Sequence, residues 1–136
     1  MDPVIADCCS NSSTNAAAER ERSQFAILME ENVLRHQLGD AGVMAGQLGL
    51  LLSVMDLPAV SLGVVPFAAA RTTWPIETST VFDDERVHCE PLSVSMKITT
   101  PDEVAQYVRA FAAFHQQAVY GAEARALIVR AIDALR

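Results

Sequence analysis

The stretch FAILMEENVLRHQLGDAGVMAGQLGLLLSVMDLPAVSLGVV, residues 25–65, decides the fold of this chain. Its first part, Phe25–Glu30, and its last part, Val60–Val65, are apolar on both alternating faces, which is typical of interior strands covered on two sides. Between them, Ala41–Met55 has the broad apolar surface of a helix that is buried against a sheet. A strand, a helix and a second buried strand form a βαβ unit, so we expect two parallel strands with a right-handed crossover.

A shorter helical segment follows the first strand directly. We expect a helical turn over Glu31–Gln37, in which Glu31 and Arg35 are four residues apart in the favourable acid-first order. Gly39 is expected to end this turn. Three more glycines fall in or near the long helix, where close helix–sheet packing is the expected reason for them: Gly42, Gly46 and Gly49.

Downstream of Pro66 the pattern changes to that of half-exposed strands. Apolar and polar residues alternate over 74–82, 87–89 and 92–98, with a turn expected at 83–85. Three such strands in sequence predict an antiparallel meander.

The C-terminal part reads as two helices. Thr100, Pro101 and Glu103 have the spacing of a capping box with proline at the first helical position, so a helix is expected from there to about Tyr120. Gly121 should break it before a last helix over 122–135. The predicted fold class is therefore α+β: a mixed sheet from one βαβ unit plus an antiparallel meander, packed with C-terminal helices.

Composition indicates how the chain is divided into domains, whether it binds nucleic acid and in which compartment it works. Residues 1–24 carry mostly polar or small residues without periodicity, so we expect a flexible N-terminal tail and a single domain over 25–136. The net charge is −7 and Lys97 is the only lysine, which argues against direct nucleic-acid binding. Three cysteines make a poor disulfide framework, and no apolar stretch reaches the ~20 residues of a membrane span. A cytoplasmic protein that does not bind membranes is expected.

No pattern in the chain indicates an enzyme, a metal site or a cofactor. His88 and Cys89 are neighbours on a predicted strand, so their side chains should point to opposite faces and cannot reach one ion. No serine lies in a nucleophile elbow, and no glycine-rich turn opens a helix as phosphate binding requires. We therefore expect no catalytic residues, no metal and no cofactor.

Two groups of residues are candidates for binding a ligand or a partner. Glu31, Arg35 and Glu90 lie near strand ends, and ligands gather at the carboxyl ends of parallel strands. These three residues could instead form ion pairs that support the start of the helix. Phe67 and Trp74 lie in an apolar loop, where an aromatic side chain serves either as a binding anchor or as core or lid packing.

The order of several motifs resembles a known family. Glu31-Asn32-Val33-Leu34-Arg35, then Val64-Val65-Pro66-Phe67, then Thr100-Pro101-Asp102-Glu103-Val104 are similar to an actinobacterial domain of unknown function. That domain forms the C-terminal part of XRE-type helix-turn-helix transcriptional regulators, some of them antitoxin-like. In the family a DNA-binding head precedes this region, whereas only residues 1–24 precede it here. The resemblance therefore implies a regulatory domain without its DNA-binding head.

The expected function is non-catalytic regulation through ligand sensing or partner binding. The partner would be another protein, a second copy of the chain or a small-molecule effector. The alternative, of a different class, is a small-molecule-binding protein or enzyme that uses an acidic cluster around Glu31 and Glu90.

Overall fold

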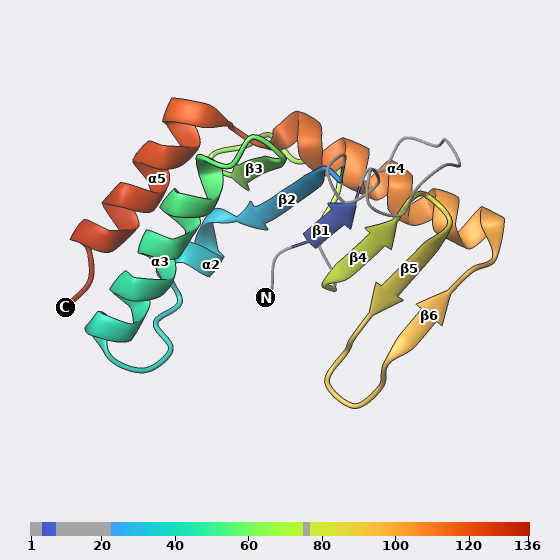
Figure 1. The fold of residues 1–136 in the computed structure, drawn as a ribbon, viewed down its shortest axis with the longest axis horizontal. Coiled ribbons are helices and arrows are strands. Elements are labelled where there is room, and N and C mark those ends of the chain that lie inside the picture. The colour runs from blue at the N-terminus through green and yellow to red at the C-terminus, as the bar shows by residue number, and fades with distance from the viewer. Residues whose placement is uncertain (1–3, 8–22, 75–76) are drawn as a thin grey trace.

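The computed structural model describes residues 4–7, 23–74 and 77–136. One six-stranded sheet runs through the molecule in the order β3-β2-β1-β4-β5-β6 (Figure 1). Its strands are Val4–Asp7 (β1), Phe25–Glu30 (β2), Val60–Val65 (β3), Ser79–Phe82 (β4), Arg86–Cys89 (β5) and Met96–Ile98 (β6). The helices are Glu31–Arg35 (α2), Ala41–Met55 (α3), Pro101–Gln117 (α4) and Gly121–Asp133 (α5).

The predicted fold class is confirmed. β2 and β3 pair in parallel and are connected through α2 and α3, as the βαβ prediction requires. β4, β5 and β6 form the antiparallel meander. The turn between β4 and β5 has positive φ angles at Asp83 and Asp84, and the amide of Glu85 donates to the carbonyl of Phe82. Asp tolerates this left-handed conformation better than most residues.

The two halves of the sheet are joined by β1, which corrects the predicted N-terminal tail. Val4–Asp7 pairs antiparallel with β2 and parallel with β4, so this segment is an interior strand of the sheet. The prediction that residues 1–24 form a flexible tail is therefore wrong for these four residues. Of the rest of the predicted tail, residues 1–3 and 8–22 lie outside the described residues, and residues 23 and 24 are in neither a helix nor a strand.

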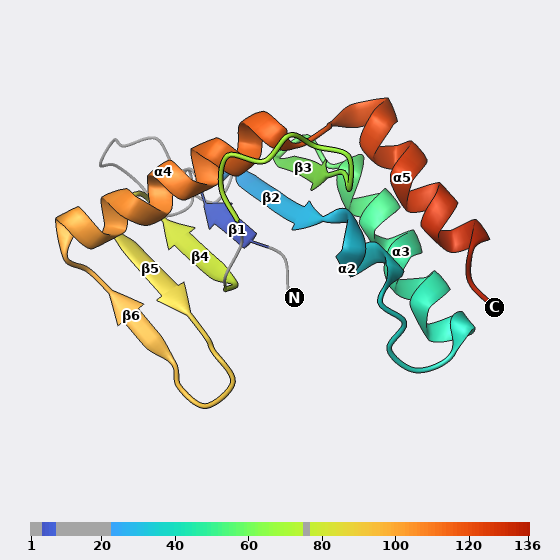
Figure 2. The same cartoon turned by 180° about the vertical axis from the view of Figure 1, so that it is seen from behind.

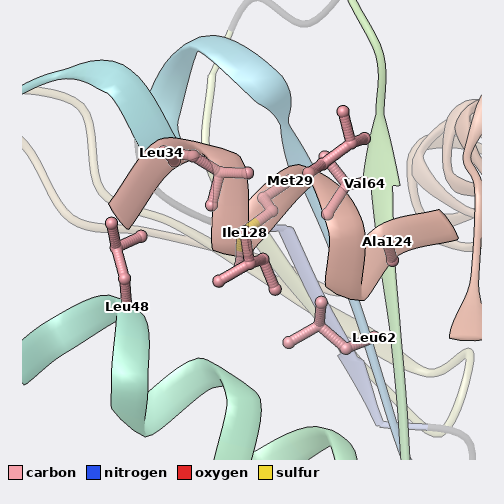
Figure 3. Packing of buried hydrophobic residues seen from close by; sticks show 9 residues of the cluster. Met29, Leu34, Leu48, Leu62, Val64, Ala124 and Ile128 are labelled. Carbon is pink, nitrogen blue, oxygen red and sulfur yellow. The ribbon is translucent and has the colours of Figure 1, made fainter. Parts of the chain in front are cut away.

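The helices cover one face of the sheet over β2 and β3, and the opposite face over the meander. α3 and α5 pack on β2 and β3 around a core that Figure 3 shows from close by, and that consists of Met29, Leu34, Leu48, Leu62, Val64, Ala124, Leu127, Ile128 and Ala131. α4 packs on the meander, where Val104 meets Val81, Val87 and Cys89. Ala26 and Val81 both pair with Ala6, so they point to the same face of the sheet, opposite to Ile27 and the first core. Figure 2 shows α4 from the other side.

The chain passes from one face to the other around the edge of β3. Val119 makes two backbone hydrogen bonds with Val64, of 2.8 and 3.0 Å, and Gly121 follows with a positive φ. Within this crossing segment, the ring of Tyr120 lies against the backbone of Gly63. A Cβ added at Gly63 would come within 2.6 Å of this ring. Glycine at this strand position is thus required by the close approach of an aromatic ring.

Several local predictions need correction. The strand expected over 74–82 begins only at Ser79, and the strand expected over 92–98 only at Met96, because Trp74, Leu92 and Val94 are exposed. Thr100 makes no side-chain capping bond, so the predicted capping box is not formed. Of the three helix glycines, the Cβ positions of Gly46 and Gly49 meet no atom within 4 Å and that of Gly42 meets only the side chain of Asp40, so close helix–sheet packing does not explain them.

Candidate functional site

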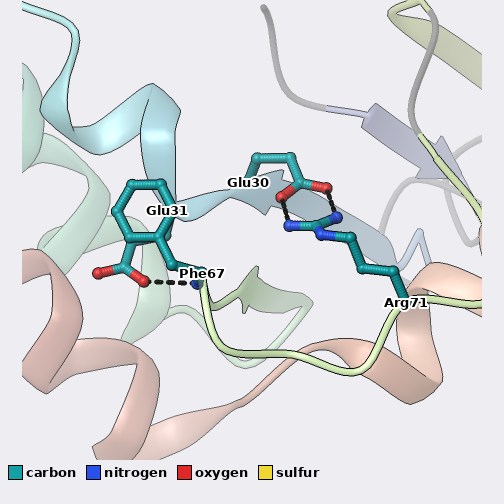
Figure 4. A network of polar contacts seen from close by, with 4 residues as sticks. All are labelled: Glu30, Glu31, Phe67 and Arg71. Carbon is teal, nitrogen blue, oxygen red and sulfur yellow. Dashed lines mark hydrogen bonds and ion pairs between the residues drawn. The ribbon is translucent and has the colours of Figure 1, made fainter.

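The site lies at the edge of the sheet where the parallel strands β2 and β3 end. Glu30 closes β2, Glu31 opens α2, and the loop 66–74 leaves β3 at the same edge. Parallel strands bring their carboxyl ends to one edge, which explains why residues far apart in the sequence meet here. Figure 4 shows the two carboxylates facing this loop.

The first carboxylate binds the far part of the loop. Glu30 accepts two hydrogen bonds from the guanidinium of Arg71, at 2.6 and 2.5 Å. The two side chains are only 11 % and 19 % exposed, so this bidentate pair is partly shielded from water. Its hydrogen bonds raise the pKa of Arg71, although burial acts in the opposite direction. The guanidinium also lies 5.0 Å from the centre of the Trp74 ring, in cation–π geometry.

The second carboxylate binds the near part of the loop. Glu31 is buried, and its Oε2 accepts a hydrogen bond of 2.8 Å from the backbone amide of Phe67. Its other oxygen lies 3.8 Å from Arg35, so the predicted acid-first pair is formed. A carboxylate at the first turn of a helix is also favoured by the helix dipole.

The two contacts hold a loop that exposes two aromatic side chains. The loop is fixed at Phe67 through its backbone and at Arg71 through its side chain. Nevertheless the side chain of Phe67 is 61 % exposed and that of Trp74 is 69 % exposed. Since large apolar side chains are normally withdrawn from water, a fixed loop that presents two of them has the geometry of a binding surface.

Four of the five predicted candidate residues meet at this edge, and Glu90 does not. Glu31 contacts both Arg35 and the backbone of Phe67, and Trp74 stacks against Arg71, which binds the neighbouring Glu30. Glu90 is exposed and follows β5, three strands away from β2 in the sheet. At about 4.8 Å between neighbouring strands, this separation is about 14 Å. The acidic cluster of Glu31 with Glu90 is therefore not formed.

Sequence reasoning missed Arg71 and Glu30, which fasten the loop. Arg71 is the only charged residue between Val60 and Ile76. A single cation in such an apolar segment needs a partner if it is to be shielded from water. This requirement, together with the two adjacent glutamates at the end of the strand, is the signal in the sequence that indicates a pair between Arg71 and a glutamate.

A second polar cluster lies under α4. The hydroxyl of Tyr107 donates to Glu77 at 2.6 Å, and Cys89 is fully buried nearby. Burial raises the pKa of the Cys89 thiol, and the hydrogen bond with Tyr107 offsets this only in part. The cluster thus keeps the thiol protonated, and a protonated thiol is a poor nucleophile.

His88 and Cys89 point to opposite faces of β5, as predicted. Cys89 faces α4, whereas the ring of His88 lies 4.9 Å from that of Phe82. In the described ranges 4–7, 23–74 and 77–136, no group of three His, Cys, Asp or Glu side chains could hold a metal ion. In the same ranges, no helix is long and apolar enough to cross a membrane.

Comparison with protein families matches residues 13–130 to a domain of unknown function, DUF5753. This match spans most of the chain. No curated protein and no solved structure matches the sequence.

Proposed function

The chain belongs to the DUF5753 family, and on this premise we propose that it is a non-catalytic, partner-binding domain of a transcriptional regulatory system. We assign the docking surface to the loop 66–74, through Phe67 and Trp74. The observation that carries the proposal is that both aromatic side chains are exposed on a loop that Glu30 and Glu31 hold in place.

Physical reasoning favours a protein partner at this loop. Buried aromatic residues supply much of the binding free energy in protein interfaces, because each removes a large apolar area from water. A loop that is already ordered before binding loses little conformational entropy when the partner docks. Arg35, whose side chain is exposed next to Glu31, supplies a charge that orients a partner.

The regulatory role rests on the motif resemblance. The order of the Glu31–Arg35, Val64–Phe67 and Thr100–Val104 segments is similar to the C-terminal part of XRE-type helix-turn-helix, antitoxin-like regulators of actinobacteria. We propose that a helix-turn-helix domain outside the present region binds the DNA, and that the present region binds the partner in the cytoplasm. Its net charge of −7 supports this division of labour, since phosphate contacts need clustered cations.

The test is calorimetric titration with the purified proteins encoded beside the gene of this chain. We expect one of them to bind, and Trp74→Ala and Phe67→Ala each to weaken its affinity at least about tenfold. Leu92→Ala is the matched control, because Leu92 is likewise an exposed large apolar side chain but lies in the loop between β5 and β6. Wild-type affinity in both aromatic variants would place the docking surface elsewhere, and the absence of any binding partner would refute the proposal.

A further inference from the structure

The charges around the loop 66–74 are unequally exposed to water. In the ion pair between β2 and this loop, the side chain of Arg71 is 19 % exposed and that of Glu30 is 11 % exposed. In the ion pair on α2, the side chain of Arg35 is 36 % exposed and that of Glu31 is 10 % exposed. The formal charges of the two pairs cancel, but the cation is the more exposed partner in each pair. A molecule that docks on the loop therefore meets more positive than negative charge from these two pairs.

The carboxylate oxygens at this edge of the sheet are already engaged. Both oxygens of Glu30 accept hydrogen bonds from Arg71, as Figure 4 shows. Oε2 of Glu31 accepts a hydrogen bond from the backbone amide of Phe67, and its Oε1 faces Arg35. A cationic partner would compete with these contacts, which hold the loop in place. The arrangement of the carboxylates thus disfavours a basic partner.

The two guanidinium groups, in contrast, keep unused hydrogen-bond donors. A guanidinium carries five N–H donors. The pair with Glu30 uses one N–H from each Nη atom of Arg71, which leaves three, the Nε–H among them. The closest approach between Arg35 and Glu31 is 3.8 Å, which is beyond hydrogen-bond distance, so this pair uses none of the donors of Arg35.

The unused donors of Arg71 lie beside the aromatic side chain that we assign to docking. The guanidinium carbon is 5.0 Å from the centre of the Trp74 ring, and this ring is 69 % exposed. A partner that covers the ring also takes water away from the guanidinium beside it. Donors that lose water in this way cost free energy unless the partner supplies acceptors. A carboxylate is the acceptor that binds a guanidinium most strongly.

We infer that the partner docks an acidic, apolar segment on this loop, with apolar side chains over Phe67 and Trp74 and an Asp or Glu carboxylate bound to Arg71. Arg35 attracts the same segment through its exposed charge. The inference rests on the proposed function and adds the chemistry of the partner to it. The net charge of −7 does not prevent such binding, because charges more than about 8 Å apart are largely screened at physiological ionic strength.

NMR titration of the full chain with two synthetic peptides tests the inference without a partner protein. Both peptides have blocked ends, and one carries a single glutamate flanked by leucines where the other carries glutamine. We expect the glutamate peptide to shift the Nε–H resonance of Arg71 and the indole N–H resonance of Trp74. We also expect it to bind at least about tenfold more tightly than the glutamine peptide, because a hydrogen bond between two charged groups is about twice as strong as a neutral one.

Three variants assign the preference to its residues. Arg71→Lys keeps a positive charge beside Glu30 but loses the fork of N–H donors, so it should remove most of the preference for glutamate while the glutamine peptide binds as before. Arg35→Met should weaken the glutamate peptide by about two- to fivefold. Arg86→Met is the matched control, because Arg86 is an exposed arginine on β5, and it should bind both peptides like wild type.

Two results would overturn the inference. One is equal affinity of the wild-type chain for the two peptides. The other is the absence of any shift at Arg71 and Trp74 up to about 10 mM of the glutamate peptide. Either result leaves the proposed function with its own test, since a neighbour-encoded protein whose binding depends on Trp74 would still support the docking surface.

Discussion

Replacing Glu30 by glutamine removes the charge that holds Arg71 while keeping the shape of the side chain. An exposed ion pair contributes about 0–1 kcal/mol, whereas the loss of one partner from a fully buried pair costs about 3–5 kcal/mol. The Glu30–Arg71 pair is 11 % and 19 % exposed and bidentate, so it lies between these limits. We expect Glu30→Gln to lower the free energy of unfolding by about 2 kcal/mol, and Arg71→Met to do the same.

The measurement is a double-mutant cycle by urea denaturation, followed by far-UV circular dichroism. If the two side chains act on each other, the double variant is less destabilised than the sum of the single variants, by about 1–2 kcal/mol. The fluorescence anisotropy of Trp74, the only tryptophan of the chain, should fall in both single variants because the loop is released. Additive losses with unchanged anisotropy would refute the view that this pair holds the loop.

Three further changes test the packing and the titrating groups. Gly63→Ala should destabilise the fold by about 1–3 kcal/mol in thermal or urea unfolding, because the added Cβ would come within 2.6 Å of the Tyr120 ring. Gly49→Ala is the control: the added Cβ would meet no atom within 4 Å, so this variant should be more stable than wild type by up to about 1 kcal/mol. In a chain whose other two cysteines are serine, Cys89 should react with a thiol reagent only as fast as the protein unfolds, since it is fully buried; rapid labelling in the native state would contradict its position. Burial raises the pKa of Tyr120 to about 12, above its unfolded value of about 10. The folded state then holds this proton longer, so the free energy of unfolding should fall between about pH 10 and pH 12, and Tyr120→Phe should reduce that dependence.

The sequence predicted best the elements that supply most of the first core. Phe25–Glu30, Ala41–Met55 and Val60–Val65 have the predicted bounds, because their apolar periodicity reflects real contacts with the core. The elements at the exposed side of the meander are shorter than predicted. Leu92 and Val94 alternate with polar residues but face water, so alternation alone was insufficient there.

β1 shows a different limit of sequence reasoning. Val4–Asp7 is only four residues long, and the structure places it through backbone pairing with β2 on one side and β4 on the other. Backbone pairing between strands distant in sequence leaves little trace in the side-chain pattern. Its insertion between β2 and β4 adds one strand to the distance that separates Glu90 from Glu31.

The candidate site was predicted in its residue types but not in its contacts. Glu31, Arg35, Phe67 and Trp74 lie at one sheet edge because the parallel order of β2 and β3 brings the loop 66–74 to the end of β2. The pairing of Arg71 with Glu30 depends on the path of that loop. A loop path is set by tertiary contacts, which the local sequence does not reveal.

The most direct measurement is acrylamide quenching of Trp74 fluorescence, in the free chain and in the chain saturated with the neighbour-encoded protein that binds it. Because Trp74 is 69 % exposed, we expect strong quenching in the free chain. In the complex we expect protection from acrylamide and a shift of the emission to shorter wavelength, as the ring leaves water. A bound chain in which Trp74 is quenched as strongly as in the free chain would contradict the assignment of the docking surface.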